Sequence, residues 1–168
     1  MDILYVWTRE GGTGQGSSDA QLRWKAGGRW LYLAVAIDLF SRRVIGWAVG
    51  DRLHRDLALA ALGKALVMRR PPEGLIHHLD RGSQYCSVDY QAELRRHGIR
   101  ISMSGKGNCY DNAMAETFFN TIKSELVRRT VFYTRDQAAP AIARYIDGFY
   151  NPVRRHSALD YISPAQFE

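Results

Sequence analysis

The sequence predicts a single α/β domain in which a mixed β-sheet is flanked by helices. Three segments rich in β-branched and aromatic residues follow one another near the start of the chain, and helix and strand patterns then alternate. The chain has 168 residues, of which 46% are hydrophobic. This size and composition suit one compact domain with a sizeable core rather than two full domains.

Three strands are expected before the first helix. Residues 2–8 form the first strand, and the turn residues Arg9-Glu-Gly-Gly12 end it. Residues 30–40 give the strongest strand pattern and are apolar on both faces, which is typical of a central strand. Residues 41–43 make a turn and residues 44–49 form the next strand. We therefore expect three successive antiparallel strands.

Helices and strands alternate in the next part of the chain. Leucine and alanine recur at helical spacing over residues 54–67, and prolines 71 and 72 follow the end of that helix. Leu75 and Ile76 then begin a short buried strand. A helix near residues 88–97 and a strand at residues 99–101 complete this unit.

Two further helices are expected in the last third of the chain. Asp111 is a good N-cap for a helix that contains Glu116. Thr134 and Gln137 form a capping-box pattern for a last helix, which Pro140 is expected to bend or delay.

The charge balance favours a polyanionic partner. Lysine and arginine number 23 against 17 acidic residues, which gives a net charge of +6. The two cysteines, Cys86 and Cys109, form no C-x-x-C pair, so neither a disulfide framework nor a zinc site is indicated. The sequence shows no membrane span and no signal segment, so we expect a soluble intracellular protein.

Two carboxylates occupy positions at which α/β proteins place their chemistry. Asp80 comes just after the short buried strand, and Glu116 falls in the first turns of its helix, with 35 residues between them. A strand end and a helix start can bring two carboxylates to one divalent metal ion. Taken alone, a turn aspartate and a glutamate stabilised by the helix dipole would be commonplace.

The neighbours of these carboxylates carry a family resemblance. The stretches Asp80-Arg-Gly-Ser-Gln-Tyr85 and Asp111-Asn-Ala-Met-Ala-Glu116 resemble the surroundings of the second and third acidic residues of DDE transposases and integrases. The likeness is closest to the insertion-sequence-three family and extends over nearly the whole chain from Trp30 onward. Residues 150–164 resemble the C-terminal signature of that family.

The resemblance implies a fold, a domain organisation and a cofactor. The expected fold is ribonuclease-H-like (retroviral-integrase-like), with a mixed five-stranded sheet flanked by helices. Residues 1–168 would form one integrase-type catalytic core, with residues 12–29 as a hairpin insertion and residues 150–168 as a C-terminal extension. Asp80 and Glu116, with a first aspartate, would hold Mg²⁺ or Mn²⁺, and two ions are expected.

The first aspartate has two candidates. Asp2 begins a stretch that resembles the Asp-Ile-Thr-Tyr-Ile motif of the family, and 77 residues separate it from Asp80. Asp19 is separated from Asp80 by 60 residues, which is nearer the usual spacing. We assign Asp2 as the ligand, with Asp19 as the alternative, because hairpin tips tolerate insertions. The strand that carries the ligand must pair with residues 30–40.

Other residues near these positions are expected to be structural. Asp38 ends a buried strand. Leu79 stands where relatives carry a small polar residue, and a leucine beside a metal ligand is harmless if its side chain points into the core. His77 and His78 cannot both reach one ion, because a strand sends neighbouring side chains to opposite faces.

A polar stripe on the Glu116 helix is a candidate DNA contact. Asn112, Glu116, Asn120 and Lys123 recur at helical spacing; such a stripe is by itself a solvated face, but beside a phosphodiester site it would lie along DNA. The basic cluster at residues 154–156 suits DNA or a soluble surface. By resemblance, the residues expected to contact DNA are Arg81, Gln84, Lys106, Asn108, Asn112, Lys123, Arg154, Arg155 and His156.

The resemblance implies the catalytic core of a bacterial insertion-element transposase. Such a DDE-type polynucleotidyl transferase cuts element ends with water and joins a 3′ hydroxyl to target DNA, in transposition. The expected partners are DNA, further copies of the chain as a homo-oligomer on DNA, and a separate helix-turn-helix segment or protein, in the bacterial cytoplasm or nucleoid. Two alternatives stay open, namely a metal-dependent nuclease that does not join strands and a catalytically inactive DNA-binding remnant.

Overall fold

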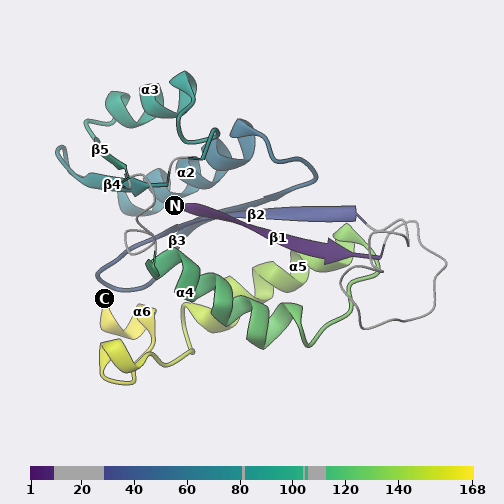
Figure 1. Ribbon diagram of the computed structural model, residues 1–168. Helices are drawn as coiled ribbons and strands as arrows, with labels where there is room; N and C mark the ends of the chain where they lie inside the picture. Colours follow the sequence, from purple (N-terminus) through teal and green to yellow (C-terminus); the bar gives the residue numbers. More distant parts are fainter. Residues whose placement is uncertain (10–28, 81, 104, 106–112) are drawn as a thin grey trace.

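A three-stranded antiparallel sheet lies at the centre of the molecule (Figure 1). The computed structural model describes residues 1–9, 29–80, 82–103, 105 and 113–168. The strands are β1 (Asp2–Thr8), β2 (Arg29–Ile37) and β3 (Val44–Gly50), with β2 in the middle. The predicted run of three antiparallel strands, with the apolar segment at its centre, is confirmed.

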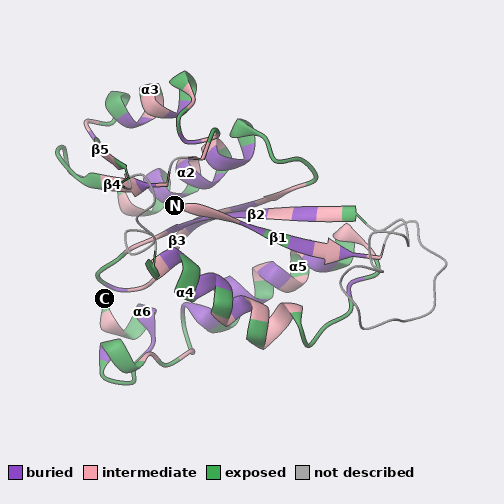
Figure 2. Cartoon of the chain, in the orientation of Figure 1, coloured by how far each residue is buried: buried purple, intermediate pink, exposed green. Residues whose placement is uncertain are grey.

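Helices cover both faces of this sheet, which explains why β2 is apolar on both sides. On one face, Leu4 and Leu33 belong to a core that includes side chains of α4 (Ala113–Ile122) and α5 (Arg135–Tyr145). On the other face, Ala34 packs with Ala61 of α2 (Arg55–Arg69). Figure 2 shows buried and exposed residues interleaved along β1 and the helices, as expected for elements with one side on a core.

A second unit contains the remaining two strands. The strands β4 (Ile76–Leu79) and β5 (Arg100–Met103) are parallel, and α3 (Val88–Arg96) connects them. Its apolar side chains, including Leu79 and Leu94, form a core with α2. The crossover through a helix is what parallel strands require.

The five strands form a three-stranded sheet and a two-stranded sheet, whereas one continuous five-stranded sheet was expected. The two sheets meet where the Met1 amino group donates a hydrogen bond to the His78 carbonyl oxygen, at 3.0 Å. Beyond this contact, a cavity of about 460 Å³ lies between them, lined by residues such as Val35, His78 and Ala115. Packing of Met1 and Ile3 on the core around Leu79, rather than a ladder of backbone hydrogen bonds, therefore joins the two sheets beside this cavity.

Side-chain caps begin α3 and α5, and the cap at Thr134 is the one that the sequence predicts. The Ser87 hydroxyl accepts a hydrogen bond from the Tyr90 amide at the start of α3, and the Thr134 hydroxyl accepts one from the Gln137 amide at the start of α5. Pro140 does not delay α5, which begins directly after Thr134 and continues through the proline. Asp111, the expected cap of α4, lies outside the described residues.

The end of the chain folds back onto the central sheet. After η4 (Ile146–Tyr150), the Asn151 side chain bonds both the amide and the carbonyl of Val44 in β3, each at 3.0 Å. Two short helices follow, η5 (Ser157–Leu159) and α6 (Pro164–Phe167). No helix in the described part of the chain has the length and apolar character needed to cross a membrane.

Candidate active site

Asp2 lies at the first position of β1, on the edge of the central sheet. It is in register with Val35 of β2, and its Oδ1 accepts a hydrogen bond from the Ile3 amide at 2.7 Å. The whole of β1 pairs with β2, from Asp2 opposite Val35 to Thr8 opposite Arg29. The strand of Asp2 is thus the hairpin partner of residues 30–40, as the assignment of Asp2 requires. Asp19 lies outside the described residues.

Asp80 directly follows β4, in a turn that leads to α3. Its Oδ1 accepts a hydrogen bond from the Gly82 amide at 2.8 Å. A Cβ on Gly82 would lie 2.9 Å from this oxygen, so a larger residue would displace the carboxylate or the turn. The preceding Leu79 is fully buried, which confirms that its side chain points into the core.

Asp2 and Asp80 approach each other where the two sheets meet. Burial raises the pKa of the Tyr85 hydroxyl, and the negative charges of Asp2 and Asp80 raise it further. Both carboxylates also act on the buried amino group of Met1, whose pKa is lowered by desolvation and partly restored by their charges. The geometry agrees, because the Met1 amino group, next to Asp2, donates a hydrogen bond to the carbonyl oxygen of His78, two residues before Asp80.

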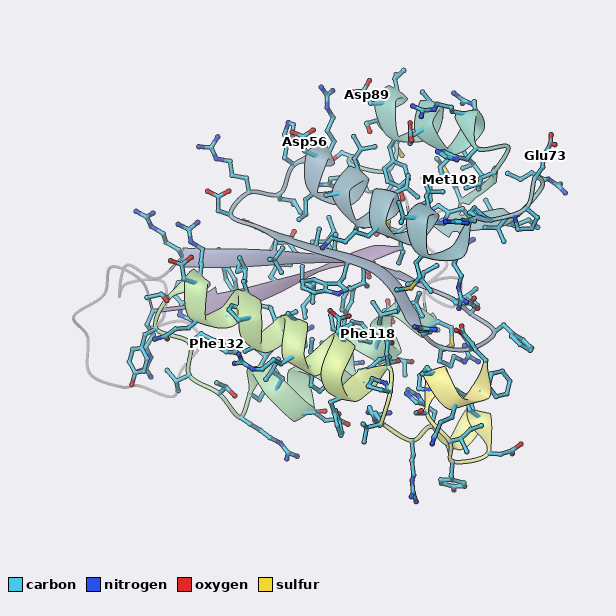
Figure 3. All side chains as sticks on the ribbon, turned by 180° about the vertical axis from the view of Figure 1, so that it is seen from behind. Asp56, Glu73, Asp89, Met103, Phe118 and Phe132 are labelled. Atoms are coloured by element: carbon cyan, nitrogen blue, oxygen red, sulfur yellow. The ribbon has the colours of Figure 1, made fainter. Side chains whose placement is uncertain are left out.

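Glu116 faces Asp2 across a hollow of about 350 Å³. Glu116 is exposed on α4, next to the side of that helix that buries Ala115 and Phe119. Phe118 of the same helix, labelled in Figure 3, belongs to the core against the central sheet. The hollow is lined by Asp2, Ile3, Leu4 and Tyr5 of β1 and by Glu116, Phe119, Asn120 and Lys123 of α4 and the turn after it. Three members of the predicted polar stripe therefore border the same space as Asp2.

The donor chemistry of this site suits a hard divalent cation. Asp2 borders the hollow with Glu116, and a hydrogen bond from Met1 to His78 joins its strand to the strand that precedes Asp80. Carboxylate oxygens are the ligands that magnesium and manganese prefer. Within the described ranges, no three His, Cys, Asp or Glu side chains come close enough together to hold one ion.

The two histidines before Asp80 have other partners. His77 Nε2 lies 3.0 Å from the Tyr90 hydroxyl oxygen, and His78 Nδ1 lies 3.0 Å from the Ser102 hydroxyl oxygen. Burial, together with the charges of the chain amino group and His78, lowers the pKa of His77 to about 3. The prediction that the two rings serve different surroundings agrees with these contacts. Asp38 is structural, since it accepts hydrogen bonds from Phe40 and Ser41 and pairs with Arg69.

The predicted DNA contacts fall into three groups. Lys123 lies in the hollow, and Gln84 is partly buried in the turn after Asp80. Of the basic cluster, Arg155 is exposed, but the Arg154 guanidinium is held by Glu125, with Nε 2.9 Å from Oε1. The His156 ring packs edge-to-face on Tyr150. Arg81, Lys106, Asn108 and Asn112 lie outside the described residues.

Arg154 and His156 therefore have structural contacts that the sequence pattern did not suggest. The guanidinium of Arg154 makes an ion pair inside the molecule, and Tyr145 donates a further hydrogen bond to the same carboxylate. Consecutive positive residues in a sequence suggest a basic surface that is free to bind DNA. Here Glu125, 29 positions away in the chain, neutralises Arg154.

Tyr85 is the site residue that sequence reasoning missed. It is 1% exposed, and among the described residues its hydroxyl has no hydrogen-bond partner. Its ring packs edge-to-face on Tyr90, with ring centroids 5.4 Å apart. The only signal in the sequence was its position at the end of the Asp80 stretch.

Comparison with solved structures defines the class of fold. The catalytic core domain of the integrase of HTLV-2, in complex with magnesium in a trimeric form, superposes with a TM-score of 0.63 at 18% identity, covering 83% of this chain and 85% of that one. A simian T-cell lymphotropic virus intasome in complex with a PP2A regulatory subunit gives a TM-score of 0.67 at 20% identity, over 83% of this chain and 48% of that one. The fold is that of the retroviral integrase catalytic cores, which is ribonuclease-H-like.

The chain belongs to the integrase core domain family. Residues 1–109 match that family, and residues 97–164 match a second family with the same description. Transposase InsF for insertion sequence IS3A of Escherichia coli strain K12 is 51% identical over 167 residues, which are 99% of this chain and 52% of that protein. An uncharacterized 31 kDa protein of insertion element IS600 from Shigella sonnei is 45% identical over 166 residues, 99% of this chain and 54% of that protein. The chain thus spans about half the length of the curated relatives it matches.

Proposed function

We propose that this chain is the catalytic core of an insertion-element transposase that cuts and joins DNA. The observation that supports the proposal most is the hollow that β1 and α4 line together, with Asp2 and Glu116 among its residues. A hydrogen bond from Met1 to His78 also joins the strand of Asp2 to the strand that precedes Asp80. The relatives that support it include a transposase of an IS3 insertion sequence. In a bacterial cell, the chain would act on DNA in the cytoplasm.

Asp2, Asp80 and Glu116 are the residues proposed to hold Mg²⁺ or Mn²⁺. When bound, two such ions activate an attacking oxygen and stabilise the leaving oxygen of a phosphodiester. The turn at Gly82 fixes one oxygen of Asp80, and the first turns of α4 carry Glu116. Lys123 and Asn120 border the same hollow, where an ammonium and an amide can bind phosphate oxygens of the DNA backbone.

The partners follow from the same assignment. The substrates are the ends of the element and the target DNA, and the active form is a homo-oligomer assembled on them. A solved integrase core of the same fold is described in a trimeric form with magnesium. Recognition of specific element ends is assigned to a separate helix-turn-helix segment or protein, since the described surface offers a metal and phosphate site.

The first test replaces Glu116 by glutamine. Glu116→Gln keeps the length and helix propensity of the side chain but removes its charge, so metal-dependent cleavage and joining of element-end DNA should fall by at least about 100-fold. The melting temperature should change little, because Glu116 is exposed. Glu73→Gln, an exposed residue that points outward far from the hollow (Figure 3), is the matched control. Wild-type turnover by folded Glu116→Gln would refute the proposal.

The second test compares the two candidate first aspartates. Magnesium or manganese binding should stabilise the wild-type protein against unfolding, by about 2.7 kcal/mol at a hundredfold excess over the dissociation constant. Asp2→Asn should abolish this stabilisation, whereas Asp19→Asn should leave it intact. The opposite pattern would transfer the ligand role to Asp19.

Strand-transfer assays separate a transposase core from a nuclease of the same fold. Preprocessed DNA ends with a free 3′ hydroxyl should be joined to a target by the wild-type protein. Hydrolysis without joining would establish the nuclease alternative, and DNA binding without metal binding would establish the inactive remnant.

A further inference from the structure

Four aromatic side chains lie together on β1 and β2, beside the candidate active site. The register places Tyr5 opposite Tyr32 and Trp7 opposite Trp30. The ring centroids are 5.1 Å apart in the first pair and 4.8 Å apart in the second, and Tyr5 links the pairs through Trp30 at 6.1 Å. These four residues, which we term the aromatic platform, form one continuous set of rings.

The aromatic platform is open to solvent although its residues are large and apolar. Tyr5 is 48% exposed, and Trp7, Trp30 and Tyr32 are half-buried. On this face of the sheet, the cluster of α2 with Ala34 and Ala48 also takes in Tyr32, but it does not include Tyr5, Trp7 or Trp30. The angles between the ring planes are 69° to 89°, which are edge-to-face contacts. In such a contact, the ring that presents its edge keeps both of its faces free of that partner.

The aromatic platform reaches the hollow at the edge of β1. Its rings lie on the face of the sheet that α2 covers, whereas α4 covers the opposite face, so the two are joined across the edge strand. Tyr5 belongs to the platform and also lines the hollow with Asp2, Glu116 and Lys123. Arg29 is exposed at the start of β2, directly before Trp30. Positive side chains therefore stand at both ends of the rings, on a chain whose net charge is +6.

Cross-strand aromatic pairs also stabilise a hairpin, by about 0.2–1 kcal/mol each. Stabilisation of the hairpin explains why the rings are paired across the two strands. It does not require the rings to be accessible to solvent, and it does not require Tyr5 to line a polar hollow. Partly exposed aromatic rings with cations at both ends match the requirements of an unpaired nucleic-acid strand, whose bases stack while its phosphates meet the charges. Paired bases in a duplex present only their edges to a protein.

We propose that the aromatic platform stacks the bases of an unpaired DNA strand whose backbone enters the hollow of Asp2 and Glu116. The inference rests on the proposed function, because it takes the hollow as the place where a phosphodiester reacts. It adds a separate binding site for the nucleotides next to the reacting bond. The platform would hold a frayed or displaced DNA end in position, and it would accept many sequences because every base has a π-face.

The test measures binding of a 12-nucleotide oligothymidine and of a random duplex of equal length, without added metal. Trp7→Leu and Trp30→Leu keep apolar bulk but remove the ring, and each should weaken oligothymidine binding by roughly 5-fold or more, since base stacking on one aromatic residue contributes about 1–3 kcal/mol. Duplex binding should change less than about 2-fold. Trp7→Tyr should restore most of the lost affinity. Phe40→Leu, which removes a ring that is 78% exposed on a different hairpin, should bind like the wild-type protein.

A second measurement does not depend on the folding of any tryptophan variant. Oligothymidine should quench the tryptophan fluorescence of the wild-type protein, and the quenching at saturation should persist at about 0.5 M salt, where phosphate contacts are weakened. Tyr5→Leu, at the most exposed ring, should reduce the affinity in the same assay. Absence of quenching, or equal oligothymidine binding by all folded leucine variants, would overturn the proposal and leave the rings as hairpin stabilisers or a protein contact.

The Glu116→Gln variant distinguishes this inference from the function on which it rests. It should bind oligothymidine like the wild-type protein while losing cleavage and joining. If cleavage depends on Glu116 but oligothymidine binding does not depend on the rings, the aromatic platform fails and the proposed function stands. If the rings bind oligothymidine but no metal-dependent reaction occurs, the proposed function fails.

Discussion

Gly46 shows how one residue sets the distance between the sheet and a helix. A Cβ at this position of β3 would lie 2.2 Å from the Ala61 carbonyl oxygen and 2.7 Å from the Ala65 amide nitrogen, both in the backbone of α2. Neither backbone atom can turn aside as a side chain can. The absent side chain therefore permits the close packing of α2 on the central sheet.

We predict that Gly46→Ala destabilises the protein by about 3 kcal/mol, as overpacking in a core does. Chemical denaturation measures this change. Gly63→Ala is the matched control, because Gly63 lies within α2 with nothing within 4 Å of an added Cβ. Alanine there should stabilise the helix by up to about 1 kcal/mol. Equal changes in the free energy of unfolding for Gly46→Ala and Gly63→Ala would show that α2 can move away from β3 at little cost.

At the scale of elements, Glu125 joins three parts of the chain. It lies in η3 (Lys123–Val127), the turn that follows α4, and accepts a hydrogen bond from the Tyr145 hydroxyl of α5 at 2.6 Å. Arg154, in the segment after η4, donates to the same carboxylate from Nε and forms an ion pair through Nη2. Glu125 thus fixes the helix of Glu116 relative to the last part of the chain.

Stability should depend on the ionisation of Glu125. Partial burial opposes ionisation, but the hydrogen bonds from Arg154 and Tyr145 outweigh it and hold the pKa below its ordinary value of 4.5. A carboxyl whose folded-state pKa is depressed stabilises the fold above the ordinary pKa, and this contribution is lost as the pH falls through the folded-state value.

We predict that Glu125→Gln lowers the free energy of unfolding at pH 7 by about 1–2 kcal/mol. It should also flatten the loss of stability below pH 4.5, which denaturant titrations at several pH values would show. Glu93→Gln is the control, because Glu93 pairs with His97 one turn further along α3 on the surface. A loss for Glu93→Gln as large as that for Glu125→Gln would contradict the joining role of Glu125.

At the scale of the whole molecule, net charge and site geometry predict how DNA is bound. The chain carries a net charge of +6, and the described candidate site consists of carboxylates with phosphate-binding side chains. The logarithm of the binding constant for random duplex DNA should therefore fall linearly and steeply with the logarithm of the salt concentration, because binding releases counterions. Titrations between about 50 and 200 mM salt measure the slope. A preference of roughly 10³-fold for one short sequence would show that this core reads bases itself.

Local patterns in the sequence determined the elements and the identity of the chemistry. Runs of β-branched and aromatic residues located β1, β2 and β3, and the capping pattern of Thr134 and Gln137 located the start of α5. The stretches around Asp80 and Glu116 carried the family resemblance, which membership of the integrase core domain family confirms. These features depend on neighbouring residues, so they are visible before the chain folds.

Only the tertiary structure decided which distant residues meet. It paired the strand of Asp2 with β2, placed Glu116 across a hollow from Asp2, and used Arg154 in an internal ion pair. It also separated β4 and β5 from the central sheet, so that packing of side chains joins the two sheets. Sequence spacing favoured no single solution for these contacts, because pairings between residues far apart in the chain are set by the packing of helices on both faces of the sheet.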